Sequence, residues 1–302
     1  MTIWCLAPFG HFCLQKVPGT KWSLLSSLDN LKRIWQEREM IAVDVQKLSH
    51  LYGSFIAVDQ ISFQIMKGET LGLLGPNGAG KSTTIKMLTT LLPVSSGTAI
   101  IGGFDIRTQG TKVREIIGYV PQLISADGEL TGRENLLLSA QLYGLTRKEW
   151  EHRIPEVLEF MGLAPWSDTL VNRYSGGMIR RLEIAQACLH RPEVLFLDEP
   201  TVGLDPAARK ALWKYIEQLR QELGTTILLT THDMDEVDLL CHKIAFMYQG
   251  KIAAMGSPEK LKVALGPHAT LDDVFILHTG SSIKETGDFY NAKQTRNTIS
   301  HL

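Results

Sequence analysis

Eight residues from Gly75 to Ser82, GPNGAGKS, have the types and spacing needed to hold phosphate groups. They fit the pattern G-x-x-x-x-G-K-[ST], whose glycines let the backbone turn sharply and point its N–H groups at phosphate oxygens. The N-terminus of a following helix adds a favourable dipole for the same anion. Lys81 can reach the β- and γ-phosphates, and the Ser82 hydroxyl can ligate Mg²⁺. A glycine-rich turn without a ligand is the alternative, but the flanking strand and helix favour a nucleotide site.

A second chemical pair, Asp198 and Glu199, ends the apolar run Val194–Leu197. At the carboxyl end of a parallel strand, these carboxylates would face the same crevice as the phosphate loop. Asp198 is suited to hold Mg²⁺, directly or through water. Glu199 is suited to polarise a water molecule that attacks the γ-phosphate. An isolated Asp-Glu pair would more often only cap a strand, but downstream of a phosphate loop the chemical interpretation is favoured.

The elements that position these residues follow from the hydrophobic pattern. Thr70–Leu74 is a short apolar run that predicts a buried strand before the loop. After the loop, Ile85, Leu88 and Leu92 recur at helical spacing, and we expect Pro93 to stop that helix. Alternating apolar residues at 41–45 and 61–65 predict two strands with one buried face.

The remainder of the chain shows a change of pattern in its middle. Strands are expected near residues 98–101 and 116–120, whereas the pattern at residues 133–163 predicts helix. Helices inserted between β-rich parts indicate a separate helical subdomain. Later, helix and strand patterns alternate, with strands expected at 194–197, 225–230 and 243–247, which favours a mainly parallel, doubly wound sheet.

Residues Tyr174–Met178, YSGGM, resemble the signature motif of ATP-binding cassette (ABC) proteins. They stand just before the strand that ends in Asp198, and the order of motifs along residues 41–265 is similar to that family throughout. The resemblance implies an α/β fold of the P-loop NTPase class. Its cassette would have a mainly parallel sheet core, an antiparallel β-subdomain and an inserted α-helical subdomain at about residues 123–177.

The resemblance also implies a role for each motif residue, with ATP and Mg²⁺ as substrate and cofactor. Catalysis would involve Glu199, His232 and Gln122, and the metal would be held by Ser82, Gln122 and Asp198. The signature would bind the ATP of a partner subunit through Ser175, Gly176 and Gly177, and Asp205 would belong to the D-loop. The nucleotide would be bound by Tyr52, Gly75, Pro76, Asn77, Gly78, Ala79, Gly80, Lys81, Ser82 and Thr83.

Several of these residues also have a plain structural interpretation. Tyr52 alone would more often be a half-buried aromatic, and Gln122 alone a polar loop residue. Ser175 is a good helix N-cap, as is Asp205 before Pro206, and we expect the capping role of Asp205 to coexist with its D-loop role. His232 alone would more often be a satisfied polar residue. Their order in the chain favours the functional interpretation.

The signature motif implies a dimer. In ABC proteins each ATP lies between the phosphate loop of one subunit and the signature of the other, so one chain serves two nucleotides. We therefore expect a second copy of this cassette as a partner. The γ-phosphate would then stabilise the closed dimer, and hydrolysis would release it.

Residues 174–206 further resemble the drug-resistance exporter ATPases of the daunorubicin-resistance type, whose permeases are of the ABC-2 class. Thr270–Phe275 is similar to the carboxyl end of that branch. Here only a few residues separate Leu261 and Lys262 from that segment, whereas many relatives carry a longer β-rich piece, which puts any regulatory role of that piece in doubt. The resemblance implies a separate ABC-2 permease and a peripheral location on the cytoplasmic face of the inner membrane.

Other functions fit these residues less well. A non-transport cassette acting in translation or DNA maintenance is the alternative within the family, but such members carry two cassettes or long coiled coils. A simple phosphotransferase would not need a signature motif. A protein that binds ATP without turnover would not need Glu199 and His232.

The bulk composition fits these expectations. A formal net charge of −1 shows no basic excess, so nucleic acid is not expected as a partner. The four cysteines are scattered and predict reduced thiols. No apolar run reaches about 18 residues, so no membrane span is predicted. The stretch Ile3–Leu14 lacks the flanking features of a secretion signal.

The two ends differ in character from the cassette. In residues 1–40, Leu24, Leu28, Leu31 and Trp35 would form one apolar face of a helix capped by Ser23. That face could bind a membrane surface, a partner or its own domain; otherwise this extension is poorly ordered, or is not made if translation starts at Met40. Residues 266–302 are expected to form a short C-terminal segment and, beyond Gly280, a disordered tail.

Overall fold

The computed structural model of the chain describes residues 40–266 and 268–280. By its contacts the chain divides into two compact units, Met1–Met40 and Ile41–Leu302, and the fold described here is that of the second. The predicted helix face at Leu24, Leu28, Leu31 and Trp35 and the predicted disorder beyond Gly280 both lie outside the described residues. The domain boundaries stay predictions.

A six-stranded sheet forms the centre of the cassette, in the order β10-β9-β3-β8-β7-β6. The strands from β9 to β6 are parallel, and β10 pairs antiparallel at one edge. Every residue of the three central strands is buried, which is why they read as continuous apolar runs rather than alternating patterns. The strands are β3 (Thr70–Leu74), β6 (Ile117–Val120), β7 (Val194–Asp198), β8 (Thr226–Thr231), β9 (Lys243–Tyr248) and β10 (Lys251–Gly256).

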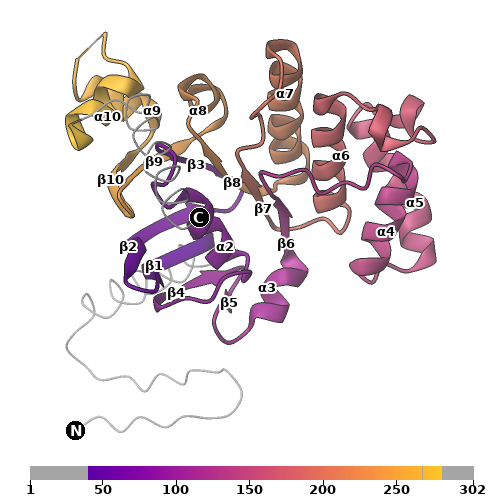
Figure 1. The fold of residues 1–302 in the computed structure, drawn as a ribbon, viewed down its shortest axis with the longest axis horizontal. Helices are drawn as coiled ribbons and strands as arrows, with labels where there is room; N and C mark the ends of the chain where they lie inside the picture. The colour runs from indigo at the N-terminus through magenta and orange to yellow at the C-terminus, as the bar shows by residue number, and fades with distance from the viewer. Residues whose placement is uncertain (1–39, 267, 281–302) are drawn as a thin grey trace, which may run out of the picture. The chain divides into compact units, whose positions relative to one another are not determined.

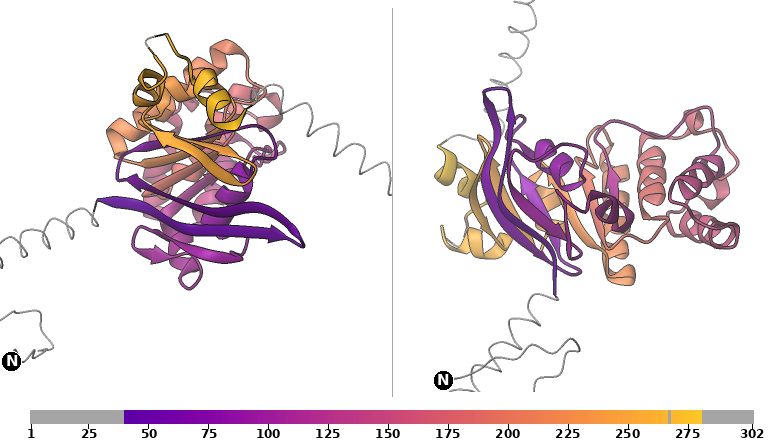
Figure 2. Two further views of the ribbon diagram at one scale, coloured as in Figure 1. Left: turned by 90° about the vertical axis from the view of Figure 1, so that its left-hand side faces the viewer. Right: turned by 90° about the horizontal axis from the view of Figure 1, so that it is seen from below.

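An antiparallel four-stranded sheet, β2-β1-β4-β5, packs against this one. Its strands are β1 (Ile41–Tyr52), β2 (Phe55–Met66), β4 (Ser96–Ile101) and β5 (Phe104–Asp105). Figures 1 and 2 show the long β1–β2 pair running beside the six-stranded sheet. The shared core includes Phe63 of β2, Leu73 of β3 and Phe196 of β7. The alternation seen in the sequence therefore marks one buried face, and the predicted fold class is confirmed.

The helix after the phosphate loop is shorter than predicted. Helix α2 spans Lys81–Leu88, so Leu92 lies outside it and the prediction of a helix up to Pro93 was wrong. The Thr89 hydroxyl donates to the Ile85 carbonyl at 2.9 Å, and Thr90 takes a positive φ of 62°. A left-handed residue cannot continue a right-handed helix, so the end is set by Thr89 and Thr90.

Three longer helices build the helical subdomain, which Figure 1 shows at the far end of the six-stranded sheet from β10. They are α4 (Gly132–Leu142), α5 (Arg147–Phe160) and α6 (Gly176–Cys188), with short 3₁₀ turns at Ala164–Trp166 and Val171–Arg173. Capping boxes start the first two, formed by Thr131 with Glu134 and by Thr146 with Glu149. Local capping thus marks off the separate helices within the helical stretch that the sequence predicted.

Helix α7 (Pro206–Leu223) follows β7 and behaves as its sequence predicts. Asp205 caps it, Pro206 takes the first position, and Gly224 ends it with a φ of 65°. Its apolar face is buried at Leu212, Ile216 and Leu219, which join the core.

Four shorter helices were not predicted from the sequence pattern. They are α3 (Gly110–Ile116), α8 (Met234–Leu240), α9 (Pro258–Val263) and α10 (Leu271–Thr279). Helix α10 is fixed by aromatic packing, with the Phe275 ring 5.7 Å from Phe246 and 6.1 Å from Tyr248 between centroids. None of the described helices has the length and hydropathy needed to span a bilayer.

Candidate nucleotide site

The phosphate loop joins β3 to α2, and two of its glycines are required by close packing. A Cβ atom on Gly75 would lie 2.2 Å from the carbonyl oxygen of Met247. Gly80 has a φ of 105°, and a Cβ there would lie 2.5 Å from the carbonyl oxygen of Ala57. The loop is therefore pressed against β9 and β2, and only glycine fits these two positions.

The side chain of Lys81 is buried inside this loop and is only 4% exposed. Its Nζ donates to the carbonyl oxygens of Gly75 at 2.7 Å and Pro76 at 3.2 Å. It also lies 3.3 Å from Glu199 Oε1. Burial lowers the pKa of Lys81, and the negative charge of Glu199 opposes that shift. The cation thus stands at the loop with the carboxylate as its counter-ion.

Asp198 collects two hydroxyl donors at the end of β7. Ser82 Oγ donates to Asp198 Oδ1 at 3.0 Å, and Thr230 Oγ1 donates to the same oxygen at 2.6 Å. Sequence reasoning missed Thr230, which faces Asp198 across the β7–β8 register. A hydroxyl at the carboxyl end of the neighbouring parallel strand was the signal that could have identified it. The hydroxyl and carboxylate oxygens of Ser82 and Asp198 are a donor set that suits Mg²⁺.

Glu199 is the residue on which the predicted motifs meet. Its Oε2 lies 3.4 Å from His232 Nδ1 and accepts a hydrogen bond of 3.4 Å from Gln122 Nε2. The residue takes a positive φ of 48°, and its N–H donates to Thr230 Oγ1 at 3.0 Å. Such a conformation is rare for a side chain of this size and is held here by the neighbouring strand.

The charges around Glu199 set its protonation. Burial raises the pKa of Glu199, but the hydrogen bond to His232 and the charge of Lys81 outweigh this effect, so the pKa lies below its ordinary value. In return, the hydrogen bond to Glu199 raises the pKa of His232. Glu199 is therefore an ionised carboxylate at neutral pH.

The other predicted residues lie apart from this cluster. Tyr52 ends β1, is 48% exposed and meets His50 edge to face at 4.5 Å between centroids. Ser175 caps α6 by accepting a hydrogen bond from Met178 N at 3.3 Å, and Gly176 beside it is exposed. Asp205 caps α7 and is also exposed. Within the described ranges, no hydrogen bond or ion pair joins Ser175 or Asp205 to residues 75–83.

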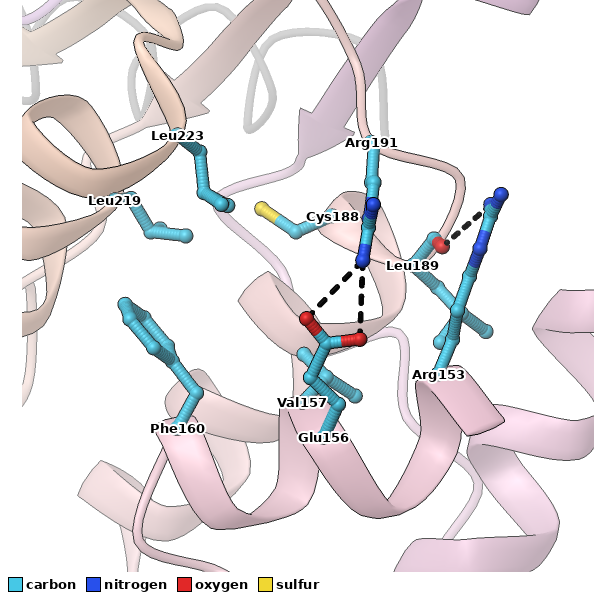
Figure 3. A pocket seen from close by; sticks show the side chains of 9 residues that line it. All are labelled: Arg153, Glu156, Val157, Phe160, Cys188, Leu189, Arg191, Leu219 and Leu223. Carbon is cyan, nitrogen blue, oxygen red and sulfur yellow. Dashed lines mark hydrogen bonds and ion pairs between the residues drawn. The ribbon is translucent and has the colours of Figure 1, made fainter. Parts of the chain in front are cut away.

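A cavity seen in Figure 3 lies elsewhere, between α5, the end of α6 and α7. It is lined by apolar side chains such as Phe160, Cys188 and Leu223, and it shares no lining residue with the motifs. Its guanidinium groups are already bound: Arg191 forms an ion pair with Glu156 at 3.1 Å, and Arg153 donates to the Leu189 carbonyl at 3.3 Å. The cavity is therefore separate from the predicted nucleotide site.

The fold and the cluster around Glu199 define the class of the protein. A phosphate loop between β3 and α2, carboxylates at the end of β7 and a helical subdomain inserted between β6 and β7 are the parts of a P-loop ATP-binding cassette. Comparison with protein families agrees, since residues 58–202 match the family described as ABC transporter.

Known proteins and a solved structure are similar to the chain over most of its length. The linearmycin resistance ATP-binding protein LnrL of Bacillus subtilis is 42% identical over 243 residues, covering 80% of this chain and 76% of that protein. The Nod factor export ATP-binding protein I of Sinorhizobium fredii is 42% identical over 236 residues, covering 78% and 68% respectively. A solved structure of an ATP-binding subunit of an ABC transporter is 31% identical with a TM-score of 0.71, covering 79% of this chain and 99% of that one.

The chain belongs to the ABC transporter family, as an ATP-binding subunit that hydrolyses ATP. Its similarity to exporter subunits confirms the predicted branch and does not favour a non-transport role in translation or DNA maintenance.

Proposed function

We propose that this chain is the ATP-hydrolysing subunit of an exporter and drives a separate permease of the ABC-2 class. The observation that carries the proposal is the convergence of Lys81, Gln122 and His232 on the Glu199 carboxylate. Proteins named for linearmycin resistance and Nod factor export, each 42% identical, support the direction of transport.

The site residues divide the chemistry of hydrolysis between them. The backbone N–H groups of the phosphate loop, with Lys81, would bind the β- and γ-phosphates. Glu199 would accept a proton or hydrogen bond from the attacking water, a contribution worth about 10²–10⁴ in rate. His232 lies at Glu199 Oε2, whereas Lys81 lies at Oε1, and His232, whose pKa is raised, would donate to the γ-phosphate. Tyr52 would stack on the adenine.

A magnesium ion would be held by Ser82 and Asp198, with the side-chain amide oxygen of Gln122 as a third ligand. When bound, Mg²⁺ supplies positive charge that neutralises the β- and γ-phosphate oxygens. The protein's own contribution is to keep the ligand oxygens of Ser82, Gln122 and Asp198 in place. The Thr230 hydroxyl does so for Asp198, because it donates a hydrogen bond to that carboxylate.

A second copy of the chain would complete each nucleotide site. Ser175 and Gly176 are exposed at the N-terminus of a 13-residue helix, where backbone N–H groups favour an anion. Because no bond joins Ser175 to the phosphate loop of its own chain within the described ranges, these groups remain available to the γ-phosphate bound by the partner. The exposed Asp205 would contact the partner subunit beside this nucleotide.

The permease would meet the surface beside Gln122. Leu123 and Ile124 follow it and are 82% and 62% exposed, and Leu142 on α4 is 80% exposed. Apolar side chains so open to water are typical of an interaction site. The chain would then act as a peripheral subunit on the cytoplasmic face of the inner membrane, with no nucleic acid as a partner.

Affinity purification from native membranes tests the transport role. The tagged full chain, extracted in a mild detergent, should bring down an integral membrane protein of about six helices with an ABC-2 pattern. Adding that protein in lipid vesicles should raise ATP turnover. A Leu123→Ser, Ile124→Ser variant should lose the copurification and keep ATP binding. Recovery of the chain with ribosomes or DNA, and without a membrane protein, would favour the non-transport role instead.

A further inference from the structure

Two charged side chains on α6, Arg180 and Glu183, are buried outside the motifs that the proposed function uses. Arg180 is 5% exposed and Glu183 is 2% exposed. Arg180 Nη1 donates to Glu183 Oε2 at 2.9 Å. Taking such a pair out of water is costly, and a buried ion pair is by itself no gain in stability over apolar residues of the same volume. Stability alone therefore does not explain why Arg180 and Glu183 are buried here.

The remaining polar atoms of the pair hold one loop, residues 121–125, which follows β6. Arg180 Nη1 donates to the carbonyl oxygen of Pro121 at 2.8 Å, and Nη2 donates to that of Gln122 at 2.8 Å. Glu183 Oε1 accepts hydrogen bonds from the backbone N–H and the hydroxyl of Ser125. A planar guanidinium is suited to this double contact, which a lysine ammonium cannot reproduce.

These contacts are the loop's main attachment to the protein. Among the described residues, the hydrogen bonds of loop 121–125 to other parts of the chain go to Arg180, Glu183 and Glu199. The bond to Glu199 comes from the Gln122 side chain, which is itself exposed. The place of the Gln122 amide is therefore set largely by α6.

We propose that Arg180 and Glu183 are positioning residues that fix loop 121–125 to α6, so that the Gln122 amide is held against Glu199. The proposal rests on the proposed function, which gives Gln122 and Glu199 their roles. Ser175 caps the N-terminus of the same helix, five residues before Arg180. A partner nucleotide that moves Ser175 would thus also move Gln122, because the pair makes α6 and the loop one rigid unit.

A double-mutant cycle with Gln122 tests this role in the full-length chain. Arg180→Lys keeps the positive charge but removes the planar guanidinium that donates to two carbonyl oxygens at once. It should lower kcat for ATP about tenfold or more, since a small misplacement of a site residue has effects of that order. It should also raise the Mg²⁺ concentration for half-maximal activity, with little change in KM for ATP. In a Gln122→Ala background, the same substitution should have no further effect, because it acts through Gln122.

Two further variants separate positioning from folding. Arg180→Met combined with Glu183→Leu fills the same space with apolar groups, so its thermal midpoint should stay near that of the wild type while kcat falls. Arg181→Met is the matched control: Arg181 is the next residue, but its hydrogen bonds go to Gly177, Met161 and Tyr215, not to the loop. It should leave the Mg²⁺ dependence unchanged.

The outcomes distinguish this inference from the function on which it rests. Equal losses from Arg180→Lys in both backgrounds, or none in either, would overturn the positioning role while leaving the ATPase intact. If the wild-type chain did not hydrolyse ATP, or if Gln122→Ala had no effect on turnover, the proposed roles of the site residues would fail first.

Discussion

Lys81 Nζ lies 3.3 Å from Glu199 Oε1, so the phosphate-loop cation and the carboxylate after β7 form a buried ion pair. Both side chains are almost fully enclosed, at 4% and 6% exposure. A bound γ-phosphate would compete with Glu199 for the same ammonium group. We expect Glu199 to become more basic as its cation turns to the phosphate, because the nearby positive charge holds its pKa down. Binding of the γ-phosphate would thereby raise the basicity of the Glu199 carboxylate.

The first prediction concerns Lys81. Lys81→Ala removes the cation at the β- and γ-phosphates while the backbone donors of the loop remain. ATP affinity should weaken severely and hydrolysis should fall below detection, as measured by titration with a fluorescent nucleotide and by phosphate release. Lys86→Ala, on the exposed side of the same helix, is the control and should have little effect. Normal turnover in Lys81→Ala would place the chemistry at another site.

A second prediction separates binding from chemistry at Glu199. Glu199→Gln keeps the volume and one hydrogen-bonding oxygen but removes the charge and the basicity. Binding of ATP and Mg²⁺ should persist, whereas hydrolysis should slow by about 10² or more. Uncleaved ATP should also hold two chains together, so gel filtration with Mg-ATP should show a dimer that ADP does not support.

The matched control for that experiment is Glu193→Gln, at an exposed position just before β7. It should hydrolyse ATP at the wild-type rate. A missing dimer alone would not decide the matter, because isolated cassettes associate weakly without their permease. Unchanged turnover in Glu199→Gln would refute the role of this carboxylate.

The phosphate loop and the carboxylate strand could be predicted because each is a local pattern. Thr70–Leu74 and Val194–Asp198 are buried on both faces, so their apolar runs are continuous, and the residues that follow them must meet at one edge of a parallel sheet. The contact of Gln122 with Glu199 joins residues 77 positions apart and could be anticipated only through the family resemblance.

Other features depend on tertiary contacts that leave no periodic signal. Thr230 is one of several hydroxyl residues near a strand end, and only the β7–β8 register puts it against Asp198. Arg180 looks like an ordinary surface charge in the sequence, yet loop 121–125 covers it. Helix α10 is short and is held by Phe275 on β9 rather than by its own propensity, since helices of nine residues are marginal alone.

A third prediction follows from the pKa of His232. Glu199 raises that pKa, so the pair stabilises the folded chain below the ordinary histidine value of about 6.5, and this contribution is lost as pH rises through the raised pKa. The thermal midpoint of the wild type should exceed that of His232→Gln most below about pH 6.5, and the difference should shrink as the pH rises through the raised pKa. The effect should be small, because the His232 side chain is half exposed.

The control for this pH series is His278→Gln, at an exposed position on α10. This variant should not reproduce the pH-dependent difference seen with His232→Gln. A difference for His232→Gln that grew with rising pH would contradict the assigned sign.

A fourth prediction tests the double role of Asp205. Its Oδ1 accepts hydrogen bonds of 2.9 Å from both Ala207 N and Ala208 N. Asp205→Ala should therefore lower the free energy of unfolding by about 1 kcal/mol, whereas Asp205→Ser should retain most of the cap. If Asp205 also meets the partner subunit, both variants should weaken the ATP-held dimer seen with Glu199→Gln. A dimer lost only in Asp205→Ala would assign the residue to capping alone.

The last prediction concerns residues 1–39. The family resemblance begins at Ile41, where β1 also begins, and the side chains gathered around Glu199 come from residues 81–232. A chain that starts at Met40 should therefore bind ATP as tightly as the full chain, as measured by fluorescent nucleotide titration at matched Mg²⁺. Its ATP turnover should be the same. A tenfold loss of affinity would show instead that the face formed by Leu24, Leu28, Leu31 and Trp35 packs on the cassette, and replacing Leu28 and Leu31 with serine in the full chain should then cause the same loss.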